Sequence, residues 1–412
     1  MRRRVVVTGF GAITPLGLSA EESWQSLLDK KSGVSALSNI DTSDLVVNFG
    51  GEVSSFEAAN YIDRKVARRV GRMIQLGLSA SNAALSHSGL VIDEDNAPRI
   101  GINIGSAIGG VEHLEKGIHL IWEKGGKARS PFHVAGTIIN MIAGMFSLEH
   151  NIKGPILAMS TGATTGIHTL GQAARLIEYG DADVMIAGAA EAPLDRAIII
   201  SLDRARVLSR RSEDPVTASR PFDLDRDGMV ISEGSGILVL EELDHARKRG
   251  AAIYAEIAGY AATADAYDRL RPQPDGEGVS RAMVSALKFA RTNVDAVHHI
   301  MAYGAATALG DRAEAAGIGR VFGCNANAPL VSCVKSLTGN LVGASGSVEA
   351  IFAALSLERQ VVVPSFNLDN PDPDCRLTYS PDTATEMSIE NVLLNAFSIG
   401  GPNATLVLKR FC

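Results

Sequence analysis

Short runs of apolar residues alternate along the whole chain with longer segments that are rich in alanine, glycine and serine. The apolar runs are largely unbroken, as in Arg4 to Ile13 and Ile100 to Gly110, instead of alternating between apolar and polar positions. Unbroken apolar strands are typical of parallel sheets that are buried on both faces, with helices supplying the cover. The pattern therefore predicts an α/β protein in which helices cover both faces of parallel sheets.

Three of these segments recur in the same order later in the chain. RVVVTGFGAI near the start is echoed by YAEIAGYAAT, and IGINIGSAIGG by HIMAYGAATALG. ILAMSTGATTGIHTLGQAARLIEYG is echoed in turn by LVSCVKSLTGNLVGASGSVEAIFAALSLERQ. Self-similarity of this kind predicts a duplicated βαβ-type unit. No linker separates the halves, so we expect residues 1–250 and 251–412 to form two halves of one body.

One predicted turn, between a strand and a helix, is of the kind that exposes a catalytic nucleophile. Pro155 to Ser160 is expected to be a short apolar strand, 161–166 a turn, and a helix follows. The turn exposes residue 163 next to the helix's N-terminal amides, which would stabilise a thiolate there. The residue is Ala163, which has nothing to ionise. The expected buried stripe of the helix comprises Ile167, Leu170, Ala174 and Ile177.

Length, composition and charge narrow the classes of function. The chain has 412 residues, of which 46% are hydrophobic, enough for a large core. A formal net charge of −7, spread over both signs, gives no reason to expect a nucleic acid as partner. No signal-type segment follows Met1, and no apolar run is long enough to span a bilayer. We therefore expect a cytoplasmic protein that does not bind membranes.

Two features resemble metal or disulfide sites without meeting their requirements. The stretch DLDRDG from Asp223 imitates the start of a calcium loop, but its twelfth position is Gly234 instead of glutamate. We interpret it as a structural turn. The cysteines lack metal-ligand spacing and are too few for a disulfide scaffold, so we expect reduced thiols, no metal and no cofactor. The cysteines are Cys324, Cys333, Cys375 and Cys412.

Resemblance to a known family rests on several segments taken together. They are VVVTGFGAITPLG, GDADVMIAGAAEA, SRPFDLDRDGMVISEGSGILVLEELDHARKRGA, KSLTGNLVGASGSVEA and FSIGGPNATLVL. As a set they resemble the β-ketoacyl-carrier-protein synthases of the thiolase fold over essentially the whole chain. The resemblance implies a layered αβαβα body of two thiolase-like halves, the first of which carries interface and cap insertions.

The resemblance also implies where the catalytic residues would lie, and all three are replaced. In that family a cysteine occupies the elbow in Thr-Ala-Cys, and two histidines occur in Asn-Ala-His-Gly-Thr and Lys-Ser-x-Thr-Gly-His. The corresponding residues here are Ala163, Tyr303 and Asn340. A methyl group cannot form a thioester, and neither a phenol nor an amide exchanges protons readily at neutral pH. We therefore expect no catalytic residue at these degenerate positions.

Such a combination of losses resembles the chain-length factors, the β subunits of type II ketosynthases. The resemblance implies a non-catalytic protein that heterodimerises with a cysteine-bearing ketosynthase α subunit. It would shape the acyl tunnel while a polyketide, polyene or fatty-acid-like chain grows on an acyl carrier protein. Many chain-length factors have glutamine at the elbow, and Ala163 departs from that pattern.

Two other hypotheses stay open at this point. In the first, the protein is a divergent homodimeric β-ketoacyl synthase or a malonyl decarboxylase that uses Tyr303 and Asn340. In the second, it binds acyl chains or carrier proteins without any synthase partner. Acyl transfer to the protein separates the first hypothesis from the others, and copurification with a homologue separates the chain-length factor from the binding protein.

Charged residues at family positions predict a remnant of the active-site network. They match charged positions that surround the synthase active site, and a buried lysine with carboxylate partners would be a plausible survivor. We expect them to serve folding alone. The predicted network comprises Lys335, Glu349, Asp311 and Glu314.

The run DRKVARRVGR, residues 63–72, predicts a basic helix face on an acidic protein. The resemblance implies a role for it, because a matching helix in the synthases receives the acidic carrier protein. The alternative is an ordinary solvated face. The predicted docking residues are Arg64, Lys65, Arg68 and Arg69.

The resemblance also implies a tunnel that ends where a side chain fills it. Ile108 is a candidate gate, because one bulky side chain blocks a narrow channel and overpacking is costly. Ile399 stands where synthases commonly have a gating phenylalanine, in FSIGGPN instead of Phe-Gly-Phe-Gly-Gly-Thr-Asn. The predicted tunnel and gate residues are Ile108, Gly109, Val111, Met141 and Ile399.

Overall fold

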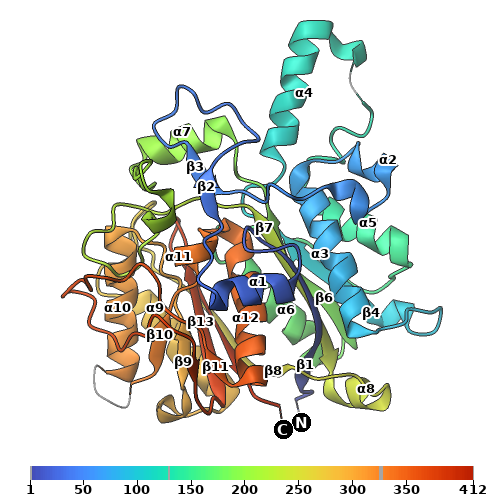
Figure 1. Cartoon of the computed structure of the whole chain (residues 1–412). Helices are drawn as coiled ribbons and strands as arrows, with labels where there is room; N and C mark the ends of the chain where they lie inside the picture. The colour runs from blue at the N-terminus through green and yellow to red at the C-terminus, as the bar shows by residue number, and fades with distance from the viewer. Residues whose placement is uncertain (1, 129, 324–327, 412) are drawn as a thin grey trace.

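The computed structural model describes residues 2–128, 130–323 and 328–411 and contains two sets of strands with the same internal order (Figure 1). The first set runs β1-β7-β6-β4-β5 and the second runs β8-β14-β13-β9-β10. In each set the first two pairings are antiparallel and the last two are parallel. The repetition confirms the predicted duplicated α/β fold. The prediction of parallel sheets is wrong, because β7 and β14 each run antiparallel to both of their neighbours. An unbroken apolar run shows that both faces of a strand are buried, but not in which direction the strand runs. The strands are β1 (Val5–Ile13), β4 (Ile100–Gly105), β5 (Ile156–Leu157), β6 (Val184–Glu191), β7 (Gly234–Glu242), β8 (Ala255–Ala264), β9 (His299–Met301), β10 (Leu330–Ser332), β13 (Asn391–Phe397) and β14 (Pro402–Lys409).

The two sets join edge to edge into one ten-stranded sheet. Val5 to Val7 of β1 pair with Ala255 to Ile257 of β8 in antiparallel register. The predicted division between residues 250 and 251 falls just before β8 and stays a prediction. Two small two-stranded sheets lie outside the large sheet. In one, β2 (Val34–Ala36) pairs with β3 (Phe49–Gly51), and in the other β11 (Val361–Val362) pairs with β12 (Thr385–Glu386).

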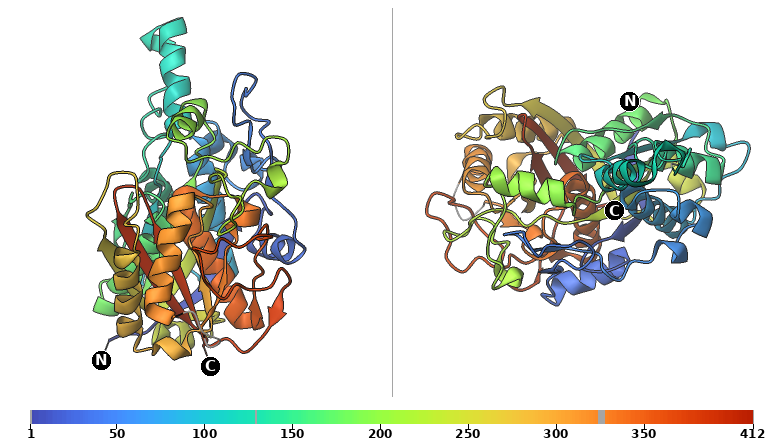
Figure 2. Two further views of the ribbon diagram at one scale, coloured as in Figure 1. Left: turned by 90° about the vertical axis from the view of Figure 1, so that its left-hand side faces the viewer. Right: turned by 90° about the horizontal axis from the view of Figure 1, so that it is seen from above.

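Helices form three layers around the strands (Figures 1 and 2). Helices α3 and α5 pack on the outer face of the first set. Helix α9 packs on the outer face of the second set, with α10 packed against α9. Helices α6 and α12 lie between the two sets. The layers therefore follow the αβαβα order. The helices are α1 (Ala20–Leu28), α2 (Arg64–Ala67), α3 (Arg72–Ser88), α4 (Val111–Lys124), α5 (Met141–His150), α6 (Thr165–Tyr179), α7 (Arg196–Arg204), α8 (Leu243–Lys248), α9 (Glu277–Ala290), α10 (Ala308–Phe322), α11 (Lys335–Thr338) and α12 (Ser345–Arg359).

Helix α6 confirms the helix that the sequence predicts after the elbow. Its predicted stripe is buried in the main hydrophobic core between the two sets of strands. The helix ends at Gly180, whose φ of +87° closes the last turn without strain. The buried stripe comprises Ile167, Leu170, Ala174 and Ile177.

The strand before the elbow is shorter than the sequence predicts. Instead of Pro155 to Ser160, only Ile156–Leu157 is extended, as the edge strand β5 paired with β4. Both side chains are more than 40% exposed, at 44% and 42%. An edge strand has one bonded neighbour, which is why apolarity alone overestimates its length here.

The basic run at residues 63–72 is not the continuous helix that its spacing predicts. Helix α2 covers only Arg64–Ala67, and α3 begins at Arg72 after Gly71 in an extended conformation. Arg72 turns inward, where its Nε lies 2.7 Å from Glu233 Oε2. This ion pair takes Arg72 out of the basic face predicted for residues 63–72, so the prediction is wrong for that residue.

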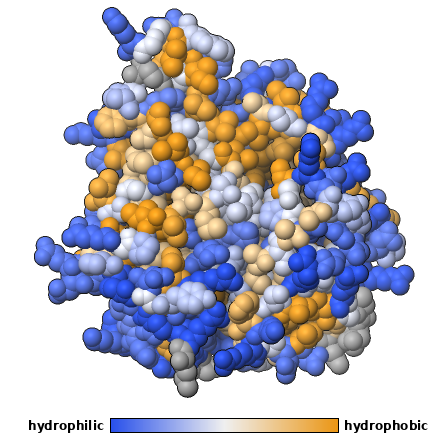
Figure 3. Space-filling model, turned by 180° about the vertical axis from the view of Figure 1, so that it is seen from behind, coloured by the Kyte–Doolittle hydropathy of each residue, from blue (hydrophilic) through white to orange (hydrophobic). Residues whose placement is uncertain are grey.

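Helix α4 projects from the body (Figures 1 and 2). It carries exposed apolar side chains. Figure 3 shows hydrophobic residues gathered along this helix and over the face beneath it. Within the described part of the chain, no helix combines the length and hydropathy needed to cross a membrane. The exposed residues on α4 are Leu114, Ile118, Ile121 and Trp122.

Candidate active site

The elbow before α6 is held by hydroxyl groups of its own turn. Gly162 has a φ of +64°, a left-handed conformation that favours glycine. Thr165 Oγ1 donates to the Gly162 carbonyl at 2.7 Å and accepts from Thr161 N at 2.9 Å. Ala163 is buried at the start of the helix. The structure thus forms a nucleophile's position, but the methyl group of Ala163 has no reactive atom.

The backbone amide of Ala163 is already engaged. It donates to Ser398 Oγ at 3.0 Å, from a residue that directly follows β13. Gly162 has no side chain at this contact, because a Cβ there would collide with the same hydroxyl. Ser398 was not among the residues predicted from the sequence. The signal was available, since Ser398 replaces the first glycine of the family's Phe-Gly-Phe-Gly-Gly-Thr-Asn pattern.

Tyr303 and Asn340 lie together next to this elbow. The Tyr303 ring packs against Phe397, the neighbour of Ser398, with ring centroids 4.5 Å apart. The Asn340 amide lies beside the Tyr303 hydroxyl, and burial raises the pKa of that phenol. Asn340 Oδ1 accepts from Val342 N at 3.0 Å, and its amide nitrogen donates to Met229 Sδ at 3.3 Å. The structure therefore brings the three replaced positions into one site.

Lys335 and Glu349 form a buried ion pair at the edge of this site. Their side chains are 1% and 2% exposed, and Lys335 Nζ contacts Glu349 Oε1 directly. The ammonium group also lies 4.7 Å from the centroid of the Tyr303 ring. Burial disfavours the ammonium ion, but the carboxylate outweighs it and the pKa of Lys335 is raised. The pair thus keeps a positive charge beside Tyr303.

The other two predicted network members have separate partners. Glu314 accepts hydrogen bonds from the backbone amides of Tyr303 and Gly304, both at 2.8 Å. Asp311 accepts from Phe222 N at 2.7 Å and lies 3.3 Å from Arg226 Nε. Burial raises the pKa of Glu314 to about 7 and that of Asp311 to about 6. Glu314 positions the Tyr303 backbone, whereas Asp311 anchors a neighbouring loop.

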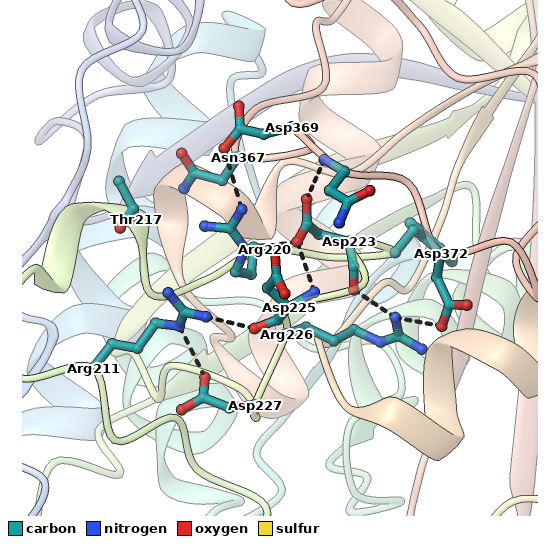
Figure 4. A network of polar contacts seen from close by, with 12 residues as sticks. Arg211, Thr217, Arg220, Asp223, Asp225, Arg226, Asp227, Asn367, Asp369 and Asp372 are labelled. Carbon is teal, nitrogen blue, oxygen red and sulfur yellow. Dashed lines mark hydrogen bonds and ion pairs between the residues drawn. The ribbon is translucent and has the colours of Figure 1, made fainter.

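Figure 4 shows that loop, which carries the DLDRDG sequence. Asp223 accepts from Arg220 Nε at 2.9 Å and from Asn370 N at 2.8 Å. Arg226 Nη1 donates to Asp372 Oδ2 at 2.8 Å. Among the described residues no group of three or more metal-ligating side chains is gathered at one place. The acidic side chains in this loop bind arginines and backbone amides, as a structural turn requires.

The predicted tunnel residues lie on two different loops and at the starts of two helices. Ile108 is half-buried at the end of β4, and a Cβ on Gly109 would lie 3.3 Å from Ile139. Ile399 is 64% exposed, on the loop next to Ser398. Val111 and Met141, the first residues of α4 and α5, are half-buried. Their roles as gate and tunnel wall stay predictions.

A buried carboxylate that was not predicted from the sequence holds the Ile108 loop. Glu191, the last residue of β6, is fully buried. It accepts hydrogen bonds from the amides of Ala107 and Ile108. Burial raises the pKa of Glu191 to about 7, against the effect of these bonds. Its position at the end of a buried apolar strand was the available signal.

The four predicted docking residues are all exposed, so the structure leaves them accessible. Lys65 lies in α2 and Arg68 caps it. The Arg69 guanidinium lies 4.6 Å from the centroid of the Phe132 ring, which covers part of its surface. The residues form a cluster around a short helix instead of a stripe along a long one.

The free cysteines do not replace the missing nucleophile. Cys333 and Cys375 are buried, whereas Cys324 and Cys412 lie outside the described residues. The Cys333 thiol donates to the Gly304 carbonyl at 3.1 Å, and burial strongly raises its pKa. A protonated, buried thiol is a poor nucleophile.

A cavity of about 310 Å³ opens elsewhere in the molecule. It lies between β1, α1, α3 and α12 and is lined in part by Phe10, His87 and Tyr254. None of the predicted site residues lines it. The cavity is therefore separate from the elbow and its side chains.

Comparison with known proteins gives consistent matches over the whole chain. Residues 2–246 match the family described as "Beta-ketoacyl synthase, N-terminal domain", and residues 254–369 match "Beta-ketoacyl synthase, C-terminal domain". A curated relative from Vibrio cholerae serotype O1, named 3-oxoacyl-(acyl-carrier-protein) synthase 2, is 44% identical over 99% of both chains.

Two solved structures share the fold over their full length. "The ishigamide ketosynthase/chain length factor" is 30% identical with a TM-score of 0.93, covering 100% of both chains. The second is "AntDE:AntF (apo): type II PKS acyl-carrier protein in complex with its ketosynthase bound to the hexaketide". It is 32% identical with a TM-score of 0.90, again over 100% of both chains.

The curated relatives contradict the hypothesis of a non-catalytic chain-length factor. Relatives named as 3-oxoacyl-(acyl-carrier-protein) synthase 2 are 41–44% identical to this chain. The solved structure named as a ketosynthase/chain length factor is 30% identical. The expectation of an inactive subunit that needs a cysteine-bearing α subunit is therefore wrong. It gave too much weight to three positions and too little to the rest of the chain.

Proposed function

The chain belongs to the β-ketoacyl synthase family, and from this premise we propose that it is an enzyme acting on acyl groups carried by an acyl carrier protein. The observation that carries the proposal is the 44% identity, over 99% of both chains, to a protein named 3-oxoacyl-(acyl-carrier-protein) synthase 2. A structural neighbour that is a ketosynthase in complex with its acyl-carrier protein supports the same partner.

The residues of the site favour one step of the family's chemistry over the other. Acyl transfer to the protein requires a nucleophile at the elbow, and the methyl group of Ala163 cannot form a thioester. Decarboxylation of a malonyl thioester requires no covalent bond to the protein. We therefore assign this chain the decarboxylation step, which corresponds to the hypothesis of a malonyl decarboxylase that uses Tyr303 and Asn340.

The proposed reaction balances without a cofactor. The bond between C2 and the carboxylate of the malonyl thioester breaks, carbon dioxide leaves, and the electron pair forms an enolate. The negative charge develops on the thioester oxygen, where a hydrogen-bond donor lowers the barrier. A proton from water then adds to C2, and the product is an acetyl thioester on the carrier protein.

Tyr303 is the proposed donor to the enolate oxygen. Burial raises the pKa of its phenol, so the hydroxyl keeps its proton at neutral pH. The Asn340 amide lies beside the phenol and favours its ionised form, but the effect of burial is larger. The Lys335 ammonium lies 4.7 Å from the ring centroid and adds a positive charge near the developing anion.

Incubation of the purified protein with malonyl-carrier protein tests the proposal. We expect acetyl-carrier protein and carbon dioxide in equal amounts, measured by intact mass and by release of labelled CO2. The mass of the protein itself stays unchanged, because no acyl-enzyme forms. The reaction requires no second subunit, and malonyl-carrier protein alone is the control. A 3-oxoacyl product would show that condensation is retained, and no turnover would overturn the proposal.

We propose that the exposed basic cluster docks the carrier protein. Reversing two charges, in the double variant Arg64→Glu and Arg68→Glu, is expected to raise KM for malonyl-carrier protein roughly tenfold and leave kcat unchanged. Each exposed ion pair contributes roughly 0.2–1 kcal/mol to binding. Losing two such pairs and putting repulsive charges in their place reaches the roughly 1.4 kcal/mol that corresponds to a tenfold change in KM. The effect shrinks at high salt.

The matched control reverses two lysines far from the cluster. Lys248→Glu in α8 and Lys288→Glu in α9 change the net charge equally. If this control raises KM as much as the arginine variant, the effect belongs to net charge and the docking assignment fails.

A further inference from the structure

The contact between Ser398 and Ala163 is built into the fold. The Ala163 amide donates to Ser398 Oγ at 3.0 Å, and no side chain on Gly162 would fit there. A tight loop fixes Ser398, because its amide donates to the Pro402 carbonyl at 3.1 Å and its carbonyl accepts from Gly401 N at 3.1 Å. The hydroxyl is therefore held against the elbow.

The hydroxyl of Ser398 still has a hydrogen to give. It accepts from Ala163 N, and among the residues that the structure describes no acceptor is bonded to its own hydrogen. Ser398 is half-buried, so part of the residue is exposed to solvent. A serine hydroxyl is one donor and two acceptors, so the bond from Ala163 leaves the donor free.

This arrangement changes where a substrate carbonyl finds its donor. A carbonyl oxygen cannot accept from the Ala163 amide without displacing Ser398. It can accept from Ser398 itself, at a position roughly 3 Å further from the amide, the length of one hydrogen bond. The amide polarises the hydroxyl through the first bond and so strengthens the second.

We propose that Ser398 is a catalytic residue that donates a hydrogen bond to the carbonyl oxygen of the substrate thioester, with Tyr303 as the second donor. The inference rests on the proposed function and adds a residue to it. With the donor shifted outward, the carbonyl lies away from residue 163. The geometry then agrees with a reaction that never forms a bond to that residue.

Two variants of Ser398 separate donation from obstruction. Ser398→Ala removes the hydroxyl, and we expect kcat for malonyl decarboxylation to fall about 10²-fold with a smaller change in KM. Ser398→Gly also uncovers the Ala163 amide, which then donates directly, so we expect a smaller fall. If Ser398 instead blocks the site, both variants are faster than the wild type. Unchanged or faster turnover overturns the inference, and an unchanged unfolding midpoint shows that the variants fold.

An infrared measurement tests the same bond without turnover. The probe is acetyl-carrier protein labelled with ¹³C at the acetyl carbonyl. In the wild type we expect its carbonyl band at lower frequency than in Ser398→Ala, because a donated hydrogen bond weakens the C=O bond.

The combination distinguishes the two proposals. If the wild type decarboxylates malonyl-carrier protein but gives the same carbonyl band as Ser398→Ala, only the role of Ser398 is overturned. A shifted band without decarboxylation overturns the proposed function while the Ser398 hydrogen bond stands. A carrier protein that does not bind overturns both.

Discussion

Replacing Glu349 with leucine is expected to lower the free energy of unfolding by about 3–5 kcal/mol. Glu349 Oε1 is the carboxylate partner of Lys335, and both side chains are almost fully buried. Without Glu349 the ammonium ion loses its counter-charge and cannot regain water, and the Tyr303 ring 4.7 Å away replaces little of it. Equilibrium denaturation with urea at pH 7 measures the loss.

The double variant Lys335→Met with Glu349→Leu is the matched control. Replacing both charges with apolar side chains of similar size is often neutral or stabilising, so we expect stability within about 2 kcal/mol of the wild type. If the double variant is as unstable as the single one, lost packing and not the isolated charge explains the effect.

The single variant also has a characteristic pH dependence. Without its carboxylate, the pKa of buried Lys335 falls below its value in the unfolded chain. Between the two pKa values the unfolded state binds more protons than the folded state, so stability rises with pH. The deficit of Glu349→Leu therefore shrinks as the pH is raised towards the pKa of an ordinary lysine. A deficit that is the same at all pH values would contradict the charge argument.

Replacing Tyr303 with phenylalanine is expected to slow malonyl decarboxylation by about 10²–10³-fold, the usual effect of removing one oxyanion donor. The ring stays packed against Phe397, so the variant should fold normally. We expect the loss of rate in kcat, because the hydrogen bond from Tyr303 to the substrate oxygen strengthens as the enolate forms. Steady-state assays with malonyl-carrier protein measure it.

Tyr254 offers a matched control for this change. Its hydroxyl lies 3.2 Å from His87 Nε2, and the residue lines the separate cavity beside β1. Tyr254→Phe removes the same hydroxyl, and we expect the rate to stay within about twofold of the wild type, as expected of a residue outside the site. Equal rates in Tyr303→Phe and the wild type would remove Tyr303 from the mechanism.

Much of the fold could be predicted from the sequence because its signals are local or repeated. Unbroken apolar runs, three echoes and a helical stripe in α6 predict the duplicated α/β fold, and the family resemblance implies its layers. The predictions are wrong where the position in the sheet or a contact with a residue distant in sequence decides the structure. The strand at Pro155 to Ser160 is short because it lies at an edge, and the basic run loses Arg72 because that residue pairs with Glu233, 161 residues away.

The functional hypothesis failed for a different reason. The loss of cysteine and histidines at Ala163, Tyr303 and Asn340 was interpreted as the loss of enzyme activity. The relatives at 41–44% identity contradict that interpretation. The identity of a residue shows which chemistry it cannot perform. It does not show what neighbouring groups perform in its place.

The sequence by itself determined the duplicated fold, the elbow before α6 and the absence of a nucleophile at residue 163, because each depends on residue type and local spacing. Only the tertiary structure decided which group occupies the amide of that elbow. Ser398 reaches Ala163 across 235 positions of sequence. A contact over that distance depends on how β13 and its loop pack against α6, and this packing leaves the Ser398 hydroxyl where a substrate carbonyl would meet it.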